Sequence, residues 1–206
     1  MILPKGEIIY KNLKTFFIDI DKFLFTLKKE EFTGEIHLLF PERECVIFLM
    51  EGDVVSGAEE KKGERHSGQK AIKNILELAR TNPNGRINVY KLSHETVSLL
   101  TTIFSHPVRL IYKNLSAEFS HLGMLIAKLK NEAFTGYIEV WFPKKKKHGI
   151  ILLENGHIKA ILTTDLKVEK KKEETHVELR PTDLRVVEEA QREGAFFNVF
   201  RISLEG

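Results

Sequence analysis

Cysteine is almost absent from this sequence, and so are long apolar runs. The 206 residues include one cysteine, Cys45, so no disulfide can form within the chain. Chains without disulfides are typical of reducing compartments, and we therefore expect a cytoplasmic protein. No run approaches the roughly 20 apolar residues of a membrane-spanning helix, and the N-terminal residues lack the apolar stretch of a signal peptide. We accordingly expect no membrane partner.

The sequence also lacks an excess of charge of one sign. It carries 32 basic and 29 acidic residues, for a formal net charge of +3, whereas nucleic-acid-binding domains usually have a one-sided basic excess. Glutamine is scarce too, at positions 69 and 191 only, while lysine and glutamate are abundant. That bias is typical of proteins from hot environments, in which ion-pair networks stabilise the fold. The balanced charge makes nucleic acid the less favoured partner.

What the sequence does contain is an internal repeat. Residues 32–41 read FTGEIHLLFP and residues 134–143 read FTGYIEVWFP, which is 134 − 32 = 102 positions later. Residues 9–13 and 111–115 both read IYKNL, and their offset is again 111 − 9 = 102. A constant offset over this many positions indicates two copies of one folding unit. We predict a first unit over 1–93, a linker with a short helix over 94–108, and a second unit over 109–206.

Apolar spacing predicts the elements of each unit. Steps of three or four residues predict a helix over 13–27 in the first copy, with its stripe formed by Leu13, Phe17, Ile20, Leu24 and Leu27. The repeated stretch then alternates in character, which predicts a strand, and glycine-containing turns separate the strands that follow. Each unit should therefore fold as β-α-β-β-β-α-β. The predicted fold class is α+β, with two tandem repeats that each form a small, mainly antiparallel sheet with two packed helices.

The repeated strand is expected to carry a partner-binding surface. Its side chains opposite the predicted core face include Leu39 in the first copy, and Tyr137 and Trp141 in the second. Exposed aromatic residues commonly anchor protein partners, so these three are our candidate partner-binding residues. The alternative is that a helix of the same unit, or the other copy, covers this face.

Residue patterns of catalysis and metal binding are missing. The eight histidines form no HxH or HxxxH pair, and none stands near Cys45 at the spacing of metal ligands. No phosphate-binding glycine loop and no nucleophile motif occurs. We therefore predict no catalytic residue, no metal, no cofactor and no enzymatic activity. A ligand or enzymatic site between the copies stays open, because clefts at domain interfaces often bind ligands.

A basic run supplies an alternative function. Four lysines occupy a predicted hairpin turn of the second copy: Lys144, Lys145, Lys146 and Lys147. Lysines beside an aromatic strand can hold a nucleic-acid backbone and stack its bases. The corresponding turn of the first copy contains Glu42, Arg43 and Glu44, so a merely solvated turn is the competing interpretation.

The order of these patterns resembles the PATAN domain, a bacterial module. In the first copy the resemblance rests on Phe32, Gly34, Ile36, Gly52, Val54, Gly85 and Ile87. In the second copy it rests on Phe134, Gly136, Ile138, Gly156, Ile158, Gly194 and Phe196. Such domains are found beside response-regulator receiver domains and other signalling parts, so the resemblance implies a signalling adaptor that binds proteins.

The leading hypothesis from the sequence is a non-enzymatic protein-interaction module of the adaptor type, with a protein partner of unknown identity. Self-association as a homodimer is left open. Nucleic-acid binding through the four lysines is the alternative.

Overall fold

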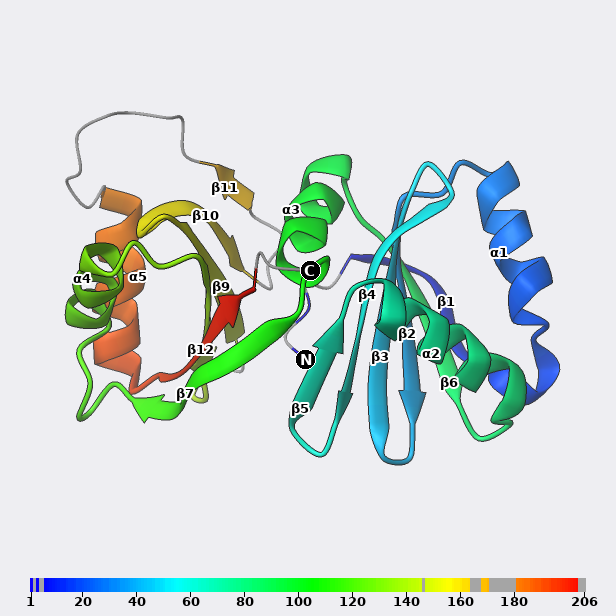
Figure 1. Cartoon of the computed structure of the whole chain (residues 1–206), viewed down its shortest axis with the longest axis horizontal. Helices are drawn as coiled ribbons and strands as arrows, with labels where there is room; N and C mark the ends of the chain where they lie inside the picture. The colour runs from blue at the N-terminus through cyan, green and yellow to red at the C-terminus, as the bar shows by residue number, and fades with distance from the viewer. Residues whose placement is uncertain (2, 4–5, 146, 164–167, 171–180, 204–206) are drawn as a thin grey trace. The chain divides into compact units, whose positions relative to one another are not determined.

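The computed structural model of the chain describes residues 1, 3, 6–145, 147–163, 168–170 and 181–203 (Figure 1). They form two compact units, one made mainly of Lys5–Val108 and the other mainly of Arg109–Ile202. Each unit combines an antiparallel sheet with packed helices, so the predicted α+β class is confirmed.

The first unit is a six-stranded sheet with helices on both faces. Its strands lie in the order β1-β6-β2-β3-β4-β5 and are β1 (Glu7–Lys14), β2 (Gly34–Phe40), β3 (Arg43–Met50), β4 (Asp53–Lys61), β5 (Glu64–Ser67) and β6 (Arg86–Lys91). Helices α1 (Ile20–Lys29) and α2 (Gln69–Thr81) pack on one face, where Leu27 and Ile75 join the core with Ile36. Helix α3 (His94–Phe104) packs on the other face, where the Phe104 ring stacks on Phe48 with centroids 5.6 Å apart.

The second unit repeats the strand order and the paired core helices of the first. Its strands lie in the order β11-β10-β9-β8-β12-β7 and are β7 (Val108–Ser116), β8 (Gly136–Phe142), β9 (Lys147–Glu154), β10 (His157–Thr163), β11 (Val168–Lys170) and β12 (Phe196–Ile202). Read from its other edge, this is the order of the first sheet, strand for strand. Helices α4 (Leu122–Asn131) and α5 (Pro181–Glu193) supply Ile126 and Ala190 to its core. The predicted tandem repeat is therefore confirmed.

Each sheet has one strand more than predicted. Strand β5 is four polar residues, ERHS, at the edge of the first sheet, and it pairs with β4. Strand β11 has three residues and pairs with β10. Short, charged strands are common at sheet edges, and strands of three or four residues with so few apolar side chains show no clear alternation. The periodicity that reveals half-buried strands is therefore missing from both.

The repeated Phe-Thr-Gly stretch ties a helix end, a strand and a hairpin turn together. The Phe32 amide donates to the Leu27 carbonyl of α1, and the Phe32 carbonyl accepts from the Gly52 amide at 2.8 Å. Thr33 Oγ1 accepts a further bond from the Glu51 amide at 3.0 Å. The second unit contains the same three bonds at its equivalent positions. The motif recurs because the backbone of each unit needs these bonds.

The glycine of the motif allows two strands to approach closely. A Cβ on Gly34 would lie 2.2 Å from the carbonyl oxygen of Tyr90, and one on Gly136 would lie 2.1 Å from that of Phe200. Both distances are shorter than any real contact of a Cβ, so only glycine fits at these positions.

The edge strands β1 and β7 share a bulge. Asn12 and Asn114 have positive φ angles of 55° and 51°, which asparagine tolerates better than most residues. The Asn12 amide donates to Oδ1 of Asn88, and the Asn114 amide donates to Oδ1 of Asn198, both at 2.9 Å. The register of β1 against β6 shifts in this region. A side chain thus completes the hydrogen bonding at the same point of both units.

The first helix of each unit begins later than predicted. Leu13 lies in β1, and Phe17 lies in a 3-10 turn, η1 (Thr15–Phe17), so the predicted helix over 13–27 is wrong in its first part. The Asp19 carboxylate caps α1 by accepting two amide hydrogen bonds from its first turn. The His121 ring caps α4 by accepting one amide hydrogen bond, from Gly123, at Nδ1. The residues before each cap cannot continue the helical stripe.

Helix α3 occupies the segment that was predicted to be a linker with a short helix. The Ser93 hydroxyl caps this helix by accepting from the Thr96 amide at 3.2 Å. Val97, Leu100 and Phe104 of the helix are all fully buried. Neither α3 nor any other helix in the described ranges has the length and apolar content needed to cross a membrane.

Candidate interaction surface

Tyr137, one of the predicted partner-binding residues, is not exposed. Its side chain is completely buried and stacks on Phe200, with ring centroids 5.0 Å apart. Leu152, directly opposite on β9, is buried as well. This face of the second sheet is apolar across several strands, and an apolar face is buried rather than solvated. The expectation of an exposed anchor at Tyr137 is therefore wrong.

Trp141 and Leu39 are both partly buried. The Trp141 ring lies against its cross-strand neighbour His148, with centroids 4.1 Å apart. Leu39 belongs to the first unit, where it lies opposite Glu44 on β3 and Arg86 on β6. The three predicted residues thus come from two units, and they form no common exposed patch within either one.

The basic turn of the second unit is partly neutralised by α5. Lys145 Nζ lies 2.8 Å from Glu189 Oε1, and this hydrogen bond raises the pKa of Lys145 and lowers that of Glu189. Lys147 Nζ lies 3.7 Å from the other oxygen of the same carboxylate. Lys144 is exposed, and Lys146 lies outside the described residues. Two of the four predicted nucleic-acid contacts therefore already face a carboxylate, which weakens the alternative function.

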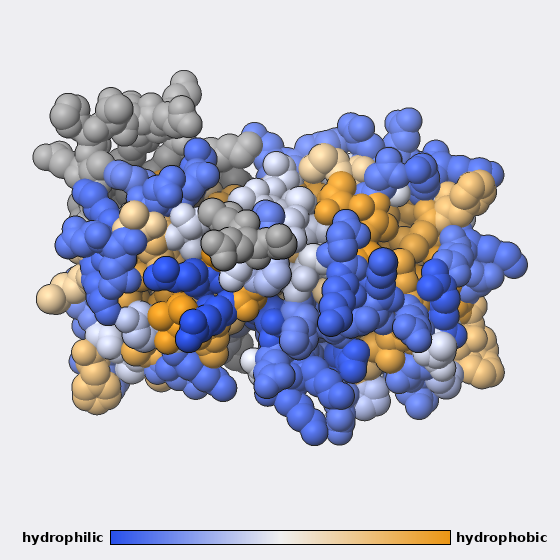
Figure 2. Space-filling view, in the orientation of Figure 1, coloured by the Kyte–Doolittle hydropathy of each residue, from blue (hydrophilic) through white to orange (hydrophobic). Residues whose placement is uncertain are grey.

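Exposed phenylalanines instead cluster in the turn that precedes the first helix of each unit. Phe16 and Phe17 are 70% and 75% exposed, and their rings meet edge to face at 5.0 Å. Phe119, at the position equivalent to Phe17 (119 − 17 = 102), is 90% exposed. Figure 2 shows hydrophobic residues at the surface around α1, among hydrophilic ones. We call residues 15–17 and 117–119 the aromatic tips.

Hydrogen bonds hold both aromatic tips to the rest of their unit. The Thr15 amide donates to the Gly85 carbonyl at 3.0 Å, and Thr15 Oγ1 accepts from the Gly85 amide at 2.9 Å. In the second unit the Ala117 amide donates to the Ala195 carbonyl at 2.8 Å. Gln191 Nε2 also donates to the Ala117 carbonyl, at 2.7 Å. A tip held in this way loses little conformational freedom when it binds.

Sequence reasoning missed the tips because their spacing is helical. Phe17 and Phe119 stand at the right steps to continue the stripes of α1 and α4. The signal that could have found them is the cap: Asp19 is a favoured N-cap residue, and a residue two positions before a cap lies outside the helix. Phe17 and Phe119, which occur at this position in both copies, therefore do not belong to the apolar stripe of the helix.

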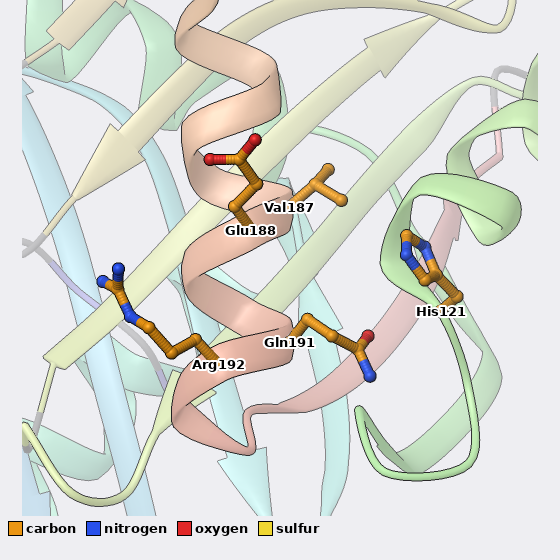
Figure 3. A pocket seen from close by; sticks show the side chains of 5 residues that line it. All are labelled: His121, Val187, Glu188, Gln191 and Arg192. Atoms are coloured by element: carbon orange, nitrogen blue, oxygen red, sulfur yellow. The ribbon is translucent and has the colours of Figure 1, made fainter.

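A groove of the second unit (Figure 3) is lined in part by Gln191, the residue that holds the aromatic tip at Ala117. Its volume is about 550 Å³, and it is lined by His121, Val187, Glu188, Gln191 and Arg192. Gln191 extends from α5 toward His121 at the start of α4 (Figure 3). Val187 is buried, and together with the aliphatic stems of the longer side chains it makes the walls largely apolar. Such a groove can accept an apolar side chain.

The same place in the first unit carries an ion pair. Arg80 of α2 binds Asp21 of α1 through two hydrogen bonds of 2.6 and 2.8 Å, which lower the pKa of Asp21. When the buried alanines 79 and 190 are matched, Arg80 corresponds to Gln191, and the offset of 102 places Asp21 at Gly123. The groove of the second unit therefore lies where Gly123 and Gln191 replace the ion pair of Asp21 and Arg80.

The first 104 residues carry the similarity to known families. They match the model of a family described as "Uncharacterized protein conserved in archaea (DUF2226)", and they make up just over half of the 206 residues. The chain belongs to this archaeal family. The resemblance to the bacterial PATAN domain is therefore wrong. Gly34 and other positions that suggested it serve the packing of the fold, so they do not identify one family.

The archaeal family match has a clear structural boundary. It runs through the first unit and stops at residue 104, which is the last residue of α3. It therefore includes the Phe16–Phe17 tip but neither Phe119 nor the groove. No curated protein and no solved structure matches the chain.

Two carboxyl groups of the first sheet, the buried Glu35 and the partly buried Glu44, have strongly shifted pKa values. Burial and the nearby charge of Glu44 raise the pKa of Glu35 to about 8, and one Glu35 oxygen has no hydrogen-bond partner. Burial would also raise the pKa of Glu44, but hydrogen bonds from His37 and the Met1 amine outweigh it and lower that pKa to about 2. Within the described residues, no three or more His, Cys, Asp or Glu side chains are grouped to hold a metal ion. Glu35 is therefore best understood as a determinant of stability.

Proposed function

We propose that this protein is a non-enzymatic protein-interaction module that docks protein partners through its aromatic tips. The observation that carries the proposal is the pair Phe17 and Phe119, which are the same residue at equivalent positions and are 75% and 90% exposed. Other residues shared by the two repeats, such as Gly34 and Gly136, have a packing reason. An exposed phenylalanine has no such reason, and binding a partner accounts for its presence in both copies.

The physical basis of the proposal is the apolar surface of the tips. Burying a phenylalanine side chain is worth roughly 1.5–3 kcal/mol, and rigidly held aromatic residues are the usual anchors of protein interfaces. Trp141 and Leu39, both partly exposed, remain secondary candidates for partner contact. Tyr137 is no longer a candidate, because its ring is buried.

The proposed compartment is the cytoplasm, where the single cysteine stays reduced. Cys45 is a free, buried cysteine, and burial raises the pKa of its thiol to about 12. A thiol with so high a pKa is a poor nucleophile at neutral pH. The proposal therefore assigns Cys45 a packing role.

Affinity capture from native cells tests the proposed function. The baits are the wild-type protein and a Phe17→Ala/Phe119→Ala double variant, and we expect the double variant to lose most of the partners that the wild type enriches. A Phe25→Ala/Met124→Ala variant is the matched control, because these residues are also exposed but lie outside the tips. Thermal unfolding verifies that all baits are folded. Equal recovery of partners by the tip variant and the wild type would contradict the proposal.

A further inference from the structure

Each unit carries one largely apolar surface of a different kind. In the first unit, Phe16 and Phe17 project from a tip that is fixed through Thr15. In the second unit, the groove beside α5 presents largely apolar walls around Val187. At the equivalent place of the first unit, Arg80 and Asp21 form an ion pair across α1 and α2. The chain thus holds a doubled aromatic tip on one unit and a largely apolar groove on the other.

The charges beside these two surfaces are also complementary. Lys14 directly precedes the tip and Glu188 lines the groove, and both side chains are exposed. Neither has an ion-pair partner within the part of the chain that the structure describes. The groove's one cation, Arg192, lies 3.2 Å from the neighbouring Glu193. The unpaired charge is therefore positive at the tip and negative at the groove.

We propose that the groove of the second unit binds the Phe16–Phe17 tip of a second copy of this chain, with Lys14 of that copy pairing with Glu188. The inference rests on the proposed function, because it names the occupant for one surface of the same module. A contact built on two aromatic side chains and one ion pair buries well under the roughly 1,200 Å² of a stable interface. The self-association is therefore weak, concentration-dependent and weakened by salt.

Sedimentation velocity of the full chain over a dilution series tests the inference. The wild type is expected to shift reversibly to larger species as its concentration rises. Phe17→Ala should raise the dissociation constant roughly tenfold or more, as loss of an aromatic anchor commonly does. Phe25→Ala, which removes an exposed phenylalanine from α1 outside the tip, should leave the constant unchanged.

A second variant closes the groove with the ion pair of the first unit. Gly123→Asp combined with Gln191→Arg places the counterparts of Asp21 and Arg80 on α4 and α5. An aspartate in the first turn of a helix is favourable, and thermal unfolding verifies that the variant folds without the Gln191 hydrogen bond. We expect it to lose self-association while both aromatic tips remain exposed.

Charge reversal tests the proposed ion pair independently of the apolar contacts. Lys14→Glu and Glu188→Lys should each weaken self-association, and the combined variant should restore most of it because the pair is re-formed with reversed sign. Lys29→Glu is the control, since this exposed lysine of α1 lies outside the tip.

Three results would overturn the inference: a wild type that stays monomeric at every concentration, self-association that survives closure of the groove, or charge reversals that do not rescue each other. Each result leaves the proposed function standing if the tip variant still fails to capture partners. Conversely, if the tip variant captures the same partners as the wild type, the proposed function is contradicted. Sedimentation velocity still tests separately whether copies of the chain associate.

Discussion

The junction of the two core-covering helices differs between the units, while the backbone beneath it is the same. In the first unit Asp21 and Arg80 join α1 to α2, and in the second unit Gly123 and Gln191 leave a groove between α4 and α5. The hydrogen bonds of the Phe-Thr-Gly stretch and of the edge bulge occur in both units. The two units thus share their backbone hydrogen bonds, whereas the side chains on their surfaces differ and can serve different functions.

The first residues of β3 and β9, which are equivalent strands, also differ in their side-chain contacts. Arg43 at the start of β3 donates to Glu59 of β4 at 2.8 Å, and Asn74 of α2 donates to the other oxygen of Glu59 at 3.0 Å. Lys147 at the start of β9 faces Glu189 of α5 instead. Both units keep a cation at this point, but its carboxylate comes from a strand in one unit and from a helix in the other.

The largest effect is expected at the glycine that both units share. Gly34→Ala and Gly136→Ala each place a Cβ about 2 Å from a carbonyl oxygen, so each should lower the free energy of unfolding by about 3 kcal/mol or more. Chemical denaturation measures the loss. Gly194→Ala is the control: its φ is +65° but no atom lies within 4 Å of the added Cβ, so about 1 kcal/mol is expected. A mild effect in one unit only would break the equivalence of the repeats.

The buried Glu35 has no acidic counterpart, since the equivalent residue in the second unit is Tyr137. Burial raises the pKa of Glu35 from 4.5 to about 8. Below about pH 4.5 both the folded and the unfolded state hold its proton; between that pH and about pH 8 only the folded state does. Stability therefore falls as the pH rises through this window, by roughly 3–5 kcal/mol in total, and stays low above it.

Glu35→Gln should remove this pH dependence. We expect a large gain in the free energy of unfolding at about pH 9 and little gain at about pH 4, measured by chemical denaturation at both values. Glu7→Gln, which alters an exposed carboxylate of β1, is the control and should change little. An equal gain from Glu35→Gln at both pH values would show that the carboxyl group is not held neutral in the folded protein.

A moderate effect is expected at the edge bulge. Asn88→Ala and Asn198→Ala each remove the acceptor of a bulge amide, which should lower the free energy of unfolding by about 1–2 kcal/mol. Asn88 is buried and Asn198 is partly exposed, so water can replace the lost acceptor more readily in the second unit. Hydrogen exchange of the Asn12 and Asn114 amides would measure the difference, and a larger effect at Asn198 would reverse this ranking.

The smallest effect is expected at the surface ion pair. Asp21→Asn removes the carboxylate that binds Arg80, and exposed pairs contribute little to stability. The melting temperature should fall slightly at low salt and match the wild type at high salt, because salt screens the pair. A large loss at high salt would mean that the pair does more than close this junction.

The repeat made much of the fold predictable from the sequence. The constant offset predicted the two units, and the alternation after Gly34 and Gly136 predicted strands and hence the fold class. These predictions succeeded because the same backbone structure requires the same residue pattern in both copies. The start of α1 was predicted too early. Phe17 has the spacing of the apolar stripe of this helix, but the helix begins only after its cap, Asp19. Strands β5 and β11 were missed because they are too short and polar to show alternation.

The candidate site was much less predictable than the fold. Whether Tyr137 is exposed depends on residues far away in the sequence, such as Leu152 and Phe200, and one strand's alternation cannot reveal them. The groove depends on two positions, Gly123 and Gln191, that matter only when compared with Asp21 and Arg80 across two helices. A local sequence pattern predicts the secondary structure of its own segment. The exposure of a surface residue depends on how several distant segments pack around it.

The bulge at Asn12 and Asn114 has a consequence for how such a chain behaves in a crowded cell. It sits on the outermost strand of each sheet and kinks the row of amides and carbonyls that a passing strand would otherwise extend. A gene duplication that doubles a sheet also doubles the edges from which fibrils can grow. Because the asparagine interrupts the regular backbone at one edge of each copy, we expect that edge to be a poorer template for a further strand.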